Sequence, residues 1–357
     1  MKLLMPSFLV VSFSAGVACV VKVLVHALLL LLLFLVEGVA AQGEGALFEV
    51  SVNKFLMGTK VETTARHAHI VDCKKALVTA YQEMARVEAL LSSLETNSEI
   101  SKINRGAGVA PVVVSKETFA IVQRAKGYSE RLNGLFDVSI GPVSDLWGFN
   151  GDGDVQVPDQ KVLDQQRDLV DFRAIVLDSV QTTIFVRHKG AKIDLGAIAK
   201  GYAIDRGVAS LKAQGVRHFL LNAGGDIYVS GMKDAQTAWR VGVKHPRHLQ
   251  DLVARFHLKD YAVATSGDYE RFKMIAGHRY HHILDPRTGY PGTLSQSATV
   301  LAPTAEEADV LATYLFLVGA DEALKQIVDI PFLIVGVDGV ARYNDAFGKR
   351  VDVEMMD

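Results

Sequence analysis

A long apolar segment at the N-terminus constrains the fold more than any other feature of the sequence. Between Leu3 and Val36 the chain is apolar apart from interruptions such as Lys22. A buried core helix of this length almost always has a polar face, and this segment has none. The small residues Val39-Ala40-Ala41 are typical of a leader-peptidase site. We therefore expect residues 1–41 to be a signal peptide or membrane anchor, and residues 42–357 to form one domain.

Composition excludes several classes of protein. Hydrophobic residues make up 49% of the 357 residues and charged residues 22%, which is enough apolar material for a large core and excludes wholesale disorder. The 38 basic and 40 acidic residues leave a net charge of −2, so we expect no nucleic-acid partner. Two cysteines are too few for a disulfide framework or a cysteine-ligated metal cluster.

Helical periodicity and capping residues predict four main helices. We expect them to begin at Asp72, at Ser115, after Asp194 and at Thr304, the last with a capping box and an end at Gly319. The apolar stripe of the first helix comprises Leu77, Tyr81, Met84, Val87, Leu91 and Leu94.

Short runs rich in β-branched and aromatic residues predict strands between and after these helices. They are Ala174–Leu177, Thr183–Val186, His218–Leu221, Arg240–Lys244 and Leu252–Leu258, with a final hairpin of Phe332–Val335 and Val340–Tyr343. Because strands and helices do not alternate evenly, an α+β fold is favoured over a doubly wound parallel sheet. The most linker-like segment is Gly148–Asp159, but no shift in composition marks a domain boundary there.

The first of five notable motifs runs from Lys192 to Asp205. Asp194 precedes a predicted helix, and Gly196 and Gly201 would let a ligand approach the backbone. Free N–H groups at a helix N-terminus suit a pyrophosphate, and Lys200 can reach the same place. The alternative is a capped helix that packs tightly through its glycines.

The second motif places two oxygen donors on one helix face. Asp309 and Thr313 are four residues apart, and a carboxylate with a hydroxyl suits Mg²⁺ completed by phosphate oxygens. The alternative is an exposed aspartate and a threonine bonded to its own helix.

Three further motifs are individually weaker. In the first, Gly134–Pro142 with Trp147 nearby, Phe136 offers flat apolar surface and Asp137 could bind polar ring or ribose atoms, although such aromatics are more often core residues. In the second, Leu221–Tyr228, a strand runs into a double glycine, as in a bulge or a close approach to a ligand.

The last motif, Arg279–Gly289, holds two adjacent histidines on a predicted strand. His281 and His282 would point to opposite sides, so at most one faces a given site. A strand histidine is usually a partly buried core residue, yet its pKa near neutrality also suits a general base.

These five motifs, in this order, resemble those of the ApbE family of FAD:protein FMN transferases. The resemblance covers nearly the whole chain after residue 41 and includes Met57-Gly58-Thr59 and Ser92–Asn104. It implies a mixed α/β, T-fold-related domain with FAD in a cleft between two lobes. It also implies a protein exported to the periplasmic side of the bacterial inner membrane, anchored or released. The implied reaction cleaves FAD, joins FMN to a Thr or Ser of a target flavoprotein through a phosphoester bond, and releases AMP.

The resemblance also implies roles for individual residues. The implied flavin-site residues are Met57, Leu94, Leu135, Phe136, Asp137, Asp194, Lys200 and Leu284. The implied Mg²⁺ ligands are Asp309, Thr313 and the carbonyl of Ala197, and His282 takes the place of the histidine proposed to activate the acceptor hydroxyl.

The chain departs from the family pattern in three respects. Leu94 stands where many members have a stacking aromatic, and Ala312 where some have a second acid before the metal-binding threonine. The family's acceptor pattern, D-G-x-T-G-A-T, is absent, so this chain is expected to modify another protein. Two alternatives remain open: a Mg²⁺-dependent FAD pyrophosphatase, or a flavin-binding lipoprotein without catalysis, which Asp309 argues against.

Overall fold

The computed structural model describes residues 47–149, 156–248 and 250–356. The expected signal or anchor at residues 1–41 lies outside the described residues, as does the middle of the predicted linker, residues 150–155. No helix in the described ranges is long and apolar enough to cross a membrane.

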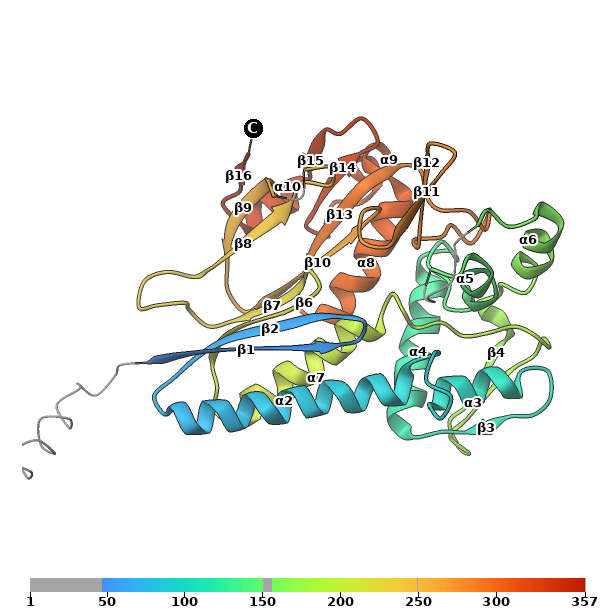
Figure 1. The fold of residues 1–357 in the computed structure, drawn as a ribbon, viewed down its shortest axis with the longest axis horizontal. Helices are drawn as coiled ribbons and strands as arrows, with labels where there is room; N and C mark the ends of the chain where they lie inside the picture. The colour runs from blue at the N-terminus through green and yellow to red at the C-terminus, as the bar shows by residue number, and fades with distance from the viewer. Residues whose placement is uncertain (1–46, 150–155, 249, 357) are drawn as a thin grey trace, which may run out of the picture. The chain divides into compact units, whose positions relative to one another are not determined.

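An eight-stranded sheet forms the centre of the domain that starts at Phe48 (Figure 1). In spatial order its strands are β1 (Phe48–Leu56), β2 (Thr59–His67), β6 (His218–Ala223), β7 (Asp226–Ser230), β10 (Tyr261–Gly267), β13 (Ser295–Ala302), β14 (Phe332–Gly336) and β15 (Ala341–Tyr343). Every neighbouring pair is antiparallel. This arrangement confirms the α+β prediction, because a doubly wound fold would need parallel neighbours.

Three smaller sheets accompany the central one. They consist of β3 (Val112–Val113), β5 (Thr183–Val186) and β4 (Ile175–Asp178); of β16 (Glu354–Met355), β9 (Leu252–Leu258) and β8 (Trp239–Lys244); and of the hairpin β11 (Phe272–Ile275) and β12 (His278–His281). The predicted strands all appear, with ends that differ by no more than two residues.

Three helices, α2 (Ile70–Leu91), α7 (Ala199–Ala213) and α8 (Ala305–Val318), share one apolar core with the strands of the central sheet. Leu77, Phe219 and Phe316 are fully buried in it. In Figure 1, α2 and α7 run beside each other, and α7 also contacts α8. The remaining helical segments are α3 (Glu99–Gly106), α4 (Lys116–Arg131), α5 (Gly141–Trp147), α6 (Gln160–Arg167), η1 (Phe172–Ala174), α9 (Ala320–Gln326) and α10 (Asp345–Arg350).

Helix ends with a local capping signal were predicted correctly. The Ser115 side chain accepts a hydrogen bond from the Thr118 N–H, Thr304 accepts one from Glu307, and Gly319 ends α8 with a φ of 82°.

The predicted bounds of two helices, α2 and α7, were wrong. Asp72 lies inside the first turn of α2, whose cap residue is His69, and Leu94 lies beyond the helix end with 67% of its surface exposed. Helix α7 begins at Ala199 rather than directly after Asp194. The Asp194 N–H is bonded to the Val138 carbonyl, which holds this residue in an extended segment before the helix.

Candidate functional site

Gly201 lets the N-terminal ends of α7 and α8 touch. A Cβ at this position would lie 2.2 Å from the Ala305 carbonyl oxygen and 2.7 Å from the Glu306 Cα. The alternative interpretation of this glycine, tight helix packing, is therefore confirmed. The close approach brings Asp309, one turn into α8, against the first turn of α7.

Asp309 accepts a hydrogen bond from the backbone of α7. Its side chain is 5% exposed, and its Oδ2 accepts a hydrogen bond of 3.0 Å from the Gly201 N–H. Gly201 is the third residue of α7, where a backbone N–H has no carbonyl partner within the helix. The Asp309 carboxylate supplies the missing acceptor and ties the start of α7 to α8.

Lys200 faces a second buried carboxylate, Asp226 at the start of β7. The Lys200 Nζ lies 2.9 Å from the Asp226 Oδ2, and the Asp226 Oδ1 accepts from the Thr265 N–H at 3.3 Å. Among the described residues, Asp226 Oδ2 has this ion pair but no hydrogen bond of good geometry. Sequence analysis missed Asp226, because its motif was interpreted through the two glycines before it.

Lys200 and Gly201 of α7, Asp226 of β7 and Asp309 of α8 meet at what we call the α7–α8 corner. Its charged groups do not balance. Burial, together with the negative charge of Asp226, raises the pKa of Asp309 to about 7, although Lys200 and the Gly201 N–H act to lower it. Burial lowers the pKa of Lys200, but the attraction of Asp226 and Asp309 outweighs it and the net shift is upward. Two carboxyl groups thus surround one ammonium group, which favours an additional cation.

The oxygen donors at the corner fit Mg²⁺. The Thr313 Oγ1, one turn after Asp309, lies 3.2 Å from the Ser266 Oγ on β10. Nowhere in the described ranges do three His, Cys, Asp or Glu side chains gather into a metal cluster. An ion at the corner would therefore depend on carboxylate, hydroxyl and carbonyl oxygens together with oxygens of a ligand, which is the usual coordination of Mg²⁺.

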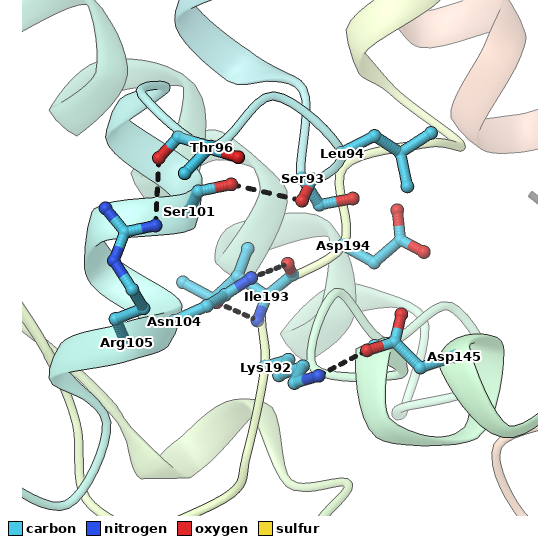
Figure 2. Close-up of a pocket in the computed structure, with 11 residues that line it drawn as sticks. Ser93, Leu94, Thr96, Ser101, Asn104, Arg105, Asp145, Lys192, Ile193 and Asp194 are labelled. Carbon is cyan, nitrogen blue, oxygen red and sulfur yellow. Dashed lines mark hydrogen bonds and ion pairs between the residues drawn. The ribbon is translucent and has the colours of Figure 1, made fainter. Parts of the chain in front are cut away.

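Asp194 and Leu94 border a cleft of about 260 Å³ (Figure 2). Asn104 holds its wall by exchanging two hydrogen bonds with the Ile193 backbone, at 2.7 and 2.9 Å, and Lys192 pairs with Asp145 across the opening. The predicted use of free N–H groups near Asp194 needs correction. The Gly196 N–H donates to Asp194 itself at 2.8 Å, and the Gly201 N–H donates to Asp309.

The segment from Leu135 to Asp137 is largely buried. Phe136 packs in an apolar core, and both oxygens of Asp137 are occupied: Oδ1 accepts from the Ser139 N–H and hydroxyl, and Oδ2 from the Phe172 N–H. Trp147 is also a core residue and stacks on Tyr280 at 5.4 Å.

Met57 and Leu284 occupy different settings. Met57 lies in the tight turn between β1 and β2 with a φ of 54°, a left-handed conformation that costs roughly 1–2 kcal/mol for such a residue. Leu284 is buried beside Val143, Trp147 and Leu163.

The two histidines differ in burial and in hydrogen-bond partner. His281 is buried, with its Nε2 2.8 Å from the Gly292 carbonyl, whereas His282 lies just beyond β12 and is only partly buried. The His282 Nδ1 lies 3.3 Å from the Arg271 carbonyl, which also accepts the His282 N–H. Because a carbonyl can only accept, this contact places the imidazole proton on Nδ1 and leaves the Nε2 lone pair available.

Burial and nearby positive charges keep the His282 ring neutral. Burial lowers its pKa well below the usual value, and the positive charges of Arg271 and Lys200 lower it further, so the ring is neutral at pH 7. Asp194 acts in turn on Arg271, raising a pKa that burial lowers. Sequence analysis missed Arg271, although the polar run Asp268–Arg271 directly after a buried strand was a possible signal.

Comparisons with known proteins agree on one family. Residues 57–332 match the ApbE family. The chain is 36% identical over 262 residues to an FAD:protein FMN transferase of Klebsiella pneumoniae, covering 71% of this chain and 80% of that protein. It is 34% identical over 291 residues to one of Treponema pallidum, covering 77% and 78%.

Two solved structures have a similar fold. The ApbE protein of Thermotoga maritima superposes with a TM-score of 0.79 at 32% identity, covering 85% of this chain and 99% of that one. The flavin transferase ApbE of Vibrio cholerae superposes with a TM-score of 0.74 at 27% identity, covering 85% and 100%.

Proposed function

This chain belongs to the ApbE family, and on that premise we propose that it is a Mg²⁺-dependent FAD:protein FMN transferase. It cleaves the pyrophosphate of FAD and attaches FMN to a Thr or Ser of a target flavoprotein. The observation that carries the proposed chemistry is the α7–α8 corner, where Asp226 and Asp309 surround Lys200. Buried carboxyl groups in excess of cations fit a divalent ion that binds with a phosphorylated substrate.

Asp309, Thr313 and the Ala197 carbonyl would hold the Mg²⁺. When bound, the ion supplies positive charge that binds phosphate oxygens and stabilises the leaving AMP. The ammonium group of Lys200 adds a second positive charge beside the phosphates, which matters because the Gly196 and Gly201 N–H groups have other partners.

His282 would activate the acceptor hydroxyl. Its neutral Nε2 takes the proton as the acceptor oxygen bonds to the FMN phosphorus and the bond from phosphorus to the AMP oxygen breaks. The Arg271 carbonyl fixes the tautomer that this step needs. The α7–α8 corner and the loop bearing His282 would together position FAD and the acceptor hydroxyl. Such positioning supplies much of the rate in phosphoryl transfer.

We propose that the flavin binds in a cleft between two lobes, along the segments that carry Met57, Leu94, Leu135–Asp137, Asp194 and Leu284. Support comes from the cleft beside Leu94 and Asp194 and from the strained backbone of Met57, since such strain concentrates at ligand sites. The Asp137 carboxylate acts indirectly, by holding the segment in shape.

Residues 1–41 would export the protein to the periplasmic side of the bacterial inner membrane and anchor it there or be removed. The support for this proposal is the apolar composition of the segment. A gel comparison of the exported protein with a chain starting at Gln42 distinguishes a retained from a cleaved segment.

The decisive experiment combines residues 42–357 with FAD, Mg²⁺ and a carrier protein bearing the D-G-x-T-G-A-T pattern, followed by mass spectrometry. We expect the carrier to gain one FMN and AMP to appear in equal amount. Free FMN and AMP with an unmodified carrier would indicate a pyrophosphatase, and unchanged FAD a binding protein.

A further inference from the structure

Two apolar side chains of the β11–β12 hairpin, Phe272 and Met274, are exposed on one of its faces. The hairpin pairs with no further described strand (Figure 1). Side chains alternate across it, so Phe272 and Met274 point to the same side. Phe272 is 39% exposed and Met274 is 55% exposed. Such exposed apolar side chains on an unpaired hairpin are typical of a surface that binds another protein.

The opposite face of the hairpin has a partner. Tyr280 lies on that face and stacks on the buried Trp147, which fixes the hairpin to the body of the domain. On the Phe272–Met274 face, His281 lies opposite Phe272 and packs edge-on against Phe316 of α8. The hairpin is therefore held on both faces, while the side chains of Phe272 and Met274 stay 39% and 55% exposed.

The hairpin connects directly to the proposed base. Arg271 precedes β11, His282 follows β12, and the two are joined by the hydrogen bonds described above. A protein whose hydroxyl reaches the His282 Nε2 must lie over the base of the hairpin. With four residues per strand, the hairpin extends about 13 Å from that point, which is within the footprint of a bound protein.

The charge of the hairpin indicates what kind of protein fits. Residues 271–282 contain Arg271, Lys273 and Arg279 and no acidic residue. Arg279 lies 3.9 Å from the centre of the Phe272 ring, which places a cation on the apolar face. Of the acids in the preceding turn, Asp268 is paired with Arg247 through two contacts of 2.7 Å, and Glu270 is exposed.

We propose that the Phe272–Met274 face of the hairpin is the docking surface for the acceptor flavoprotein, and that the docked segment carries apolar and acidic side chains. This inference rests on the proposed function, because it assigns the protein substrate of the same site. Apolar contacts supply affinity there, and the basic residues orient the acceptor with its hydroxyl toward His282.

The test measures FMN transfer by Met274→Glu at varied concentrations of the D-G-x-T-G-A-T carrier, with FAD and Mg²⁺ saturating. We expect the KM for the carrier to rise at least tenfold, with kcat and the Kd for FAD changed less than twofold. The matched control is Val180→Glu, which adds the same charge at a 93% exposed side chain of the β4–β5 turn. Its KM should stay within twofold of the unaltered protein.

The outcomes separate the two proposals. If the unaltered protein transfers FMN and Met274→Glu has an unchanged KM, the docking surface is refuted and the proposed function stands. If the unaltered protein transfers no FMN, the proposed function itself fails. A rise of the KM with salt in the unaltered protein supports acidic residues on the acceptor, and a salt-independent KM contradicts them.

Discussion

Two buried aspartates of this domain, Asp137 and Asp309, lie in very different surroundings. Asp137 accepts hydrogen bonds from three donors in its own neighbourhood, two from Ser139 and one from Phe172. Asp309 has one backbone donor, shares its site with Asp226, and has a pKa raised by burial to about 7. Both lie in motifs of the family, and their sequence context alone makes them equally good candidates.

The difference separates a structural carboxylate from a reactive one. A buried carboxylate with all its hydrogen bonds satisfied stabilises the surrounding loop and has little capacity left for a ligand. A buried carboxylate beside another one is stabilised when a cation binds. We therefore assign the metal chemistry to Asp309 and a supporting role to Asp137.

The largest expected effect is that of Asp309→Ala. Without this carboxylate the phosphate charge loses its metal, so FMN transfer should fall by at least about 1,000-fold and FAD should bind more weakly in the presence of Mg²⁺. Asp309→Asn is the matched control, because an amide oxygen can still accept from the Gly201 N–H. If Asp309→Asn keeps full activity, the metal assignment is wrong.

His282→Ala should lower the transfer rate by roughly 100-fold or more, in the range typical of a general base, while the Kd for FAD changes little. Single-turnover kinetics with pre-bound FAD measure this rate separately from binding. Equal losses in the rate and in the affinity for FAD would mean that His282 binds the substrate and does not act as a base.

Asp137→Ala should act on stability. Three buried donors lose their acceptor, at a cost of about 3 kcal/mol in the free energy of unfolding. Asp137→Asn, which keeps one acceptor oxygen, should lose less. Urea unfolding measures both variants, and calorimetry measures FAD binding by the folded protein. A loss of FAD affinity without a loss of stability would contradict the supporting role.

The smallest expected effect is a pH-dependent response to Mg²⁺. The pKa of Asp309 is higher in the folded than in the unfolded protein, so its contribution to stability is full below about pH 4 and is lost as pH rises toward 7. Mg²⁺ binds the ionised form and should restore stability above that pH. We expect Mg²⁺ to raise the Tm by about 2–4 °C at pH 8 and by less than 1 °C at pH 5.5. The same increase at both pH values would exclude Asp309 as the ligand.

The sequence predicted those parts of the fold that depend on neighbouring residues. Ser115 and Thr304 cap their helices through side chains three residues from their partners, and the strands follow local composition. The start of α7 was misplaced because a non-local bond, from the Asp194 N–H to the Val138 carbonyl, holds the chain extended there.

The prediction of site residues was limited in the same way, to residues that are close in sequence. Asp309 and Thr313 were found because one turn of helix places them together. Asp226 was not found, because its meeting with Lys200 depends on how the β6–β7 turn packs against α7. Arg271 was not found either, because its carbonyl oxygen and its charge reach His282 only when β11 and β12 pair as a hairpin.

The contact at Gly201 has a consequence for how the corner behaves as the protein fluctuates. Because main chain meets main chain, without a side chain between α7 and α8, the spacing of the two helix ends is set by direct backbone contact. An added methyl group would act as a wedge and push the two helix ends apart. We therefore expect position 201 to be glycine in all related sequences, even where neighbouring surface residues vary.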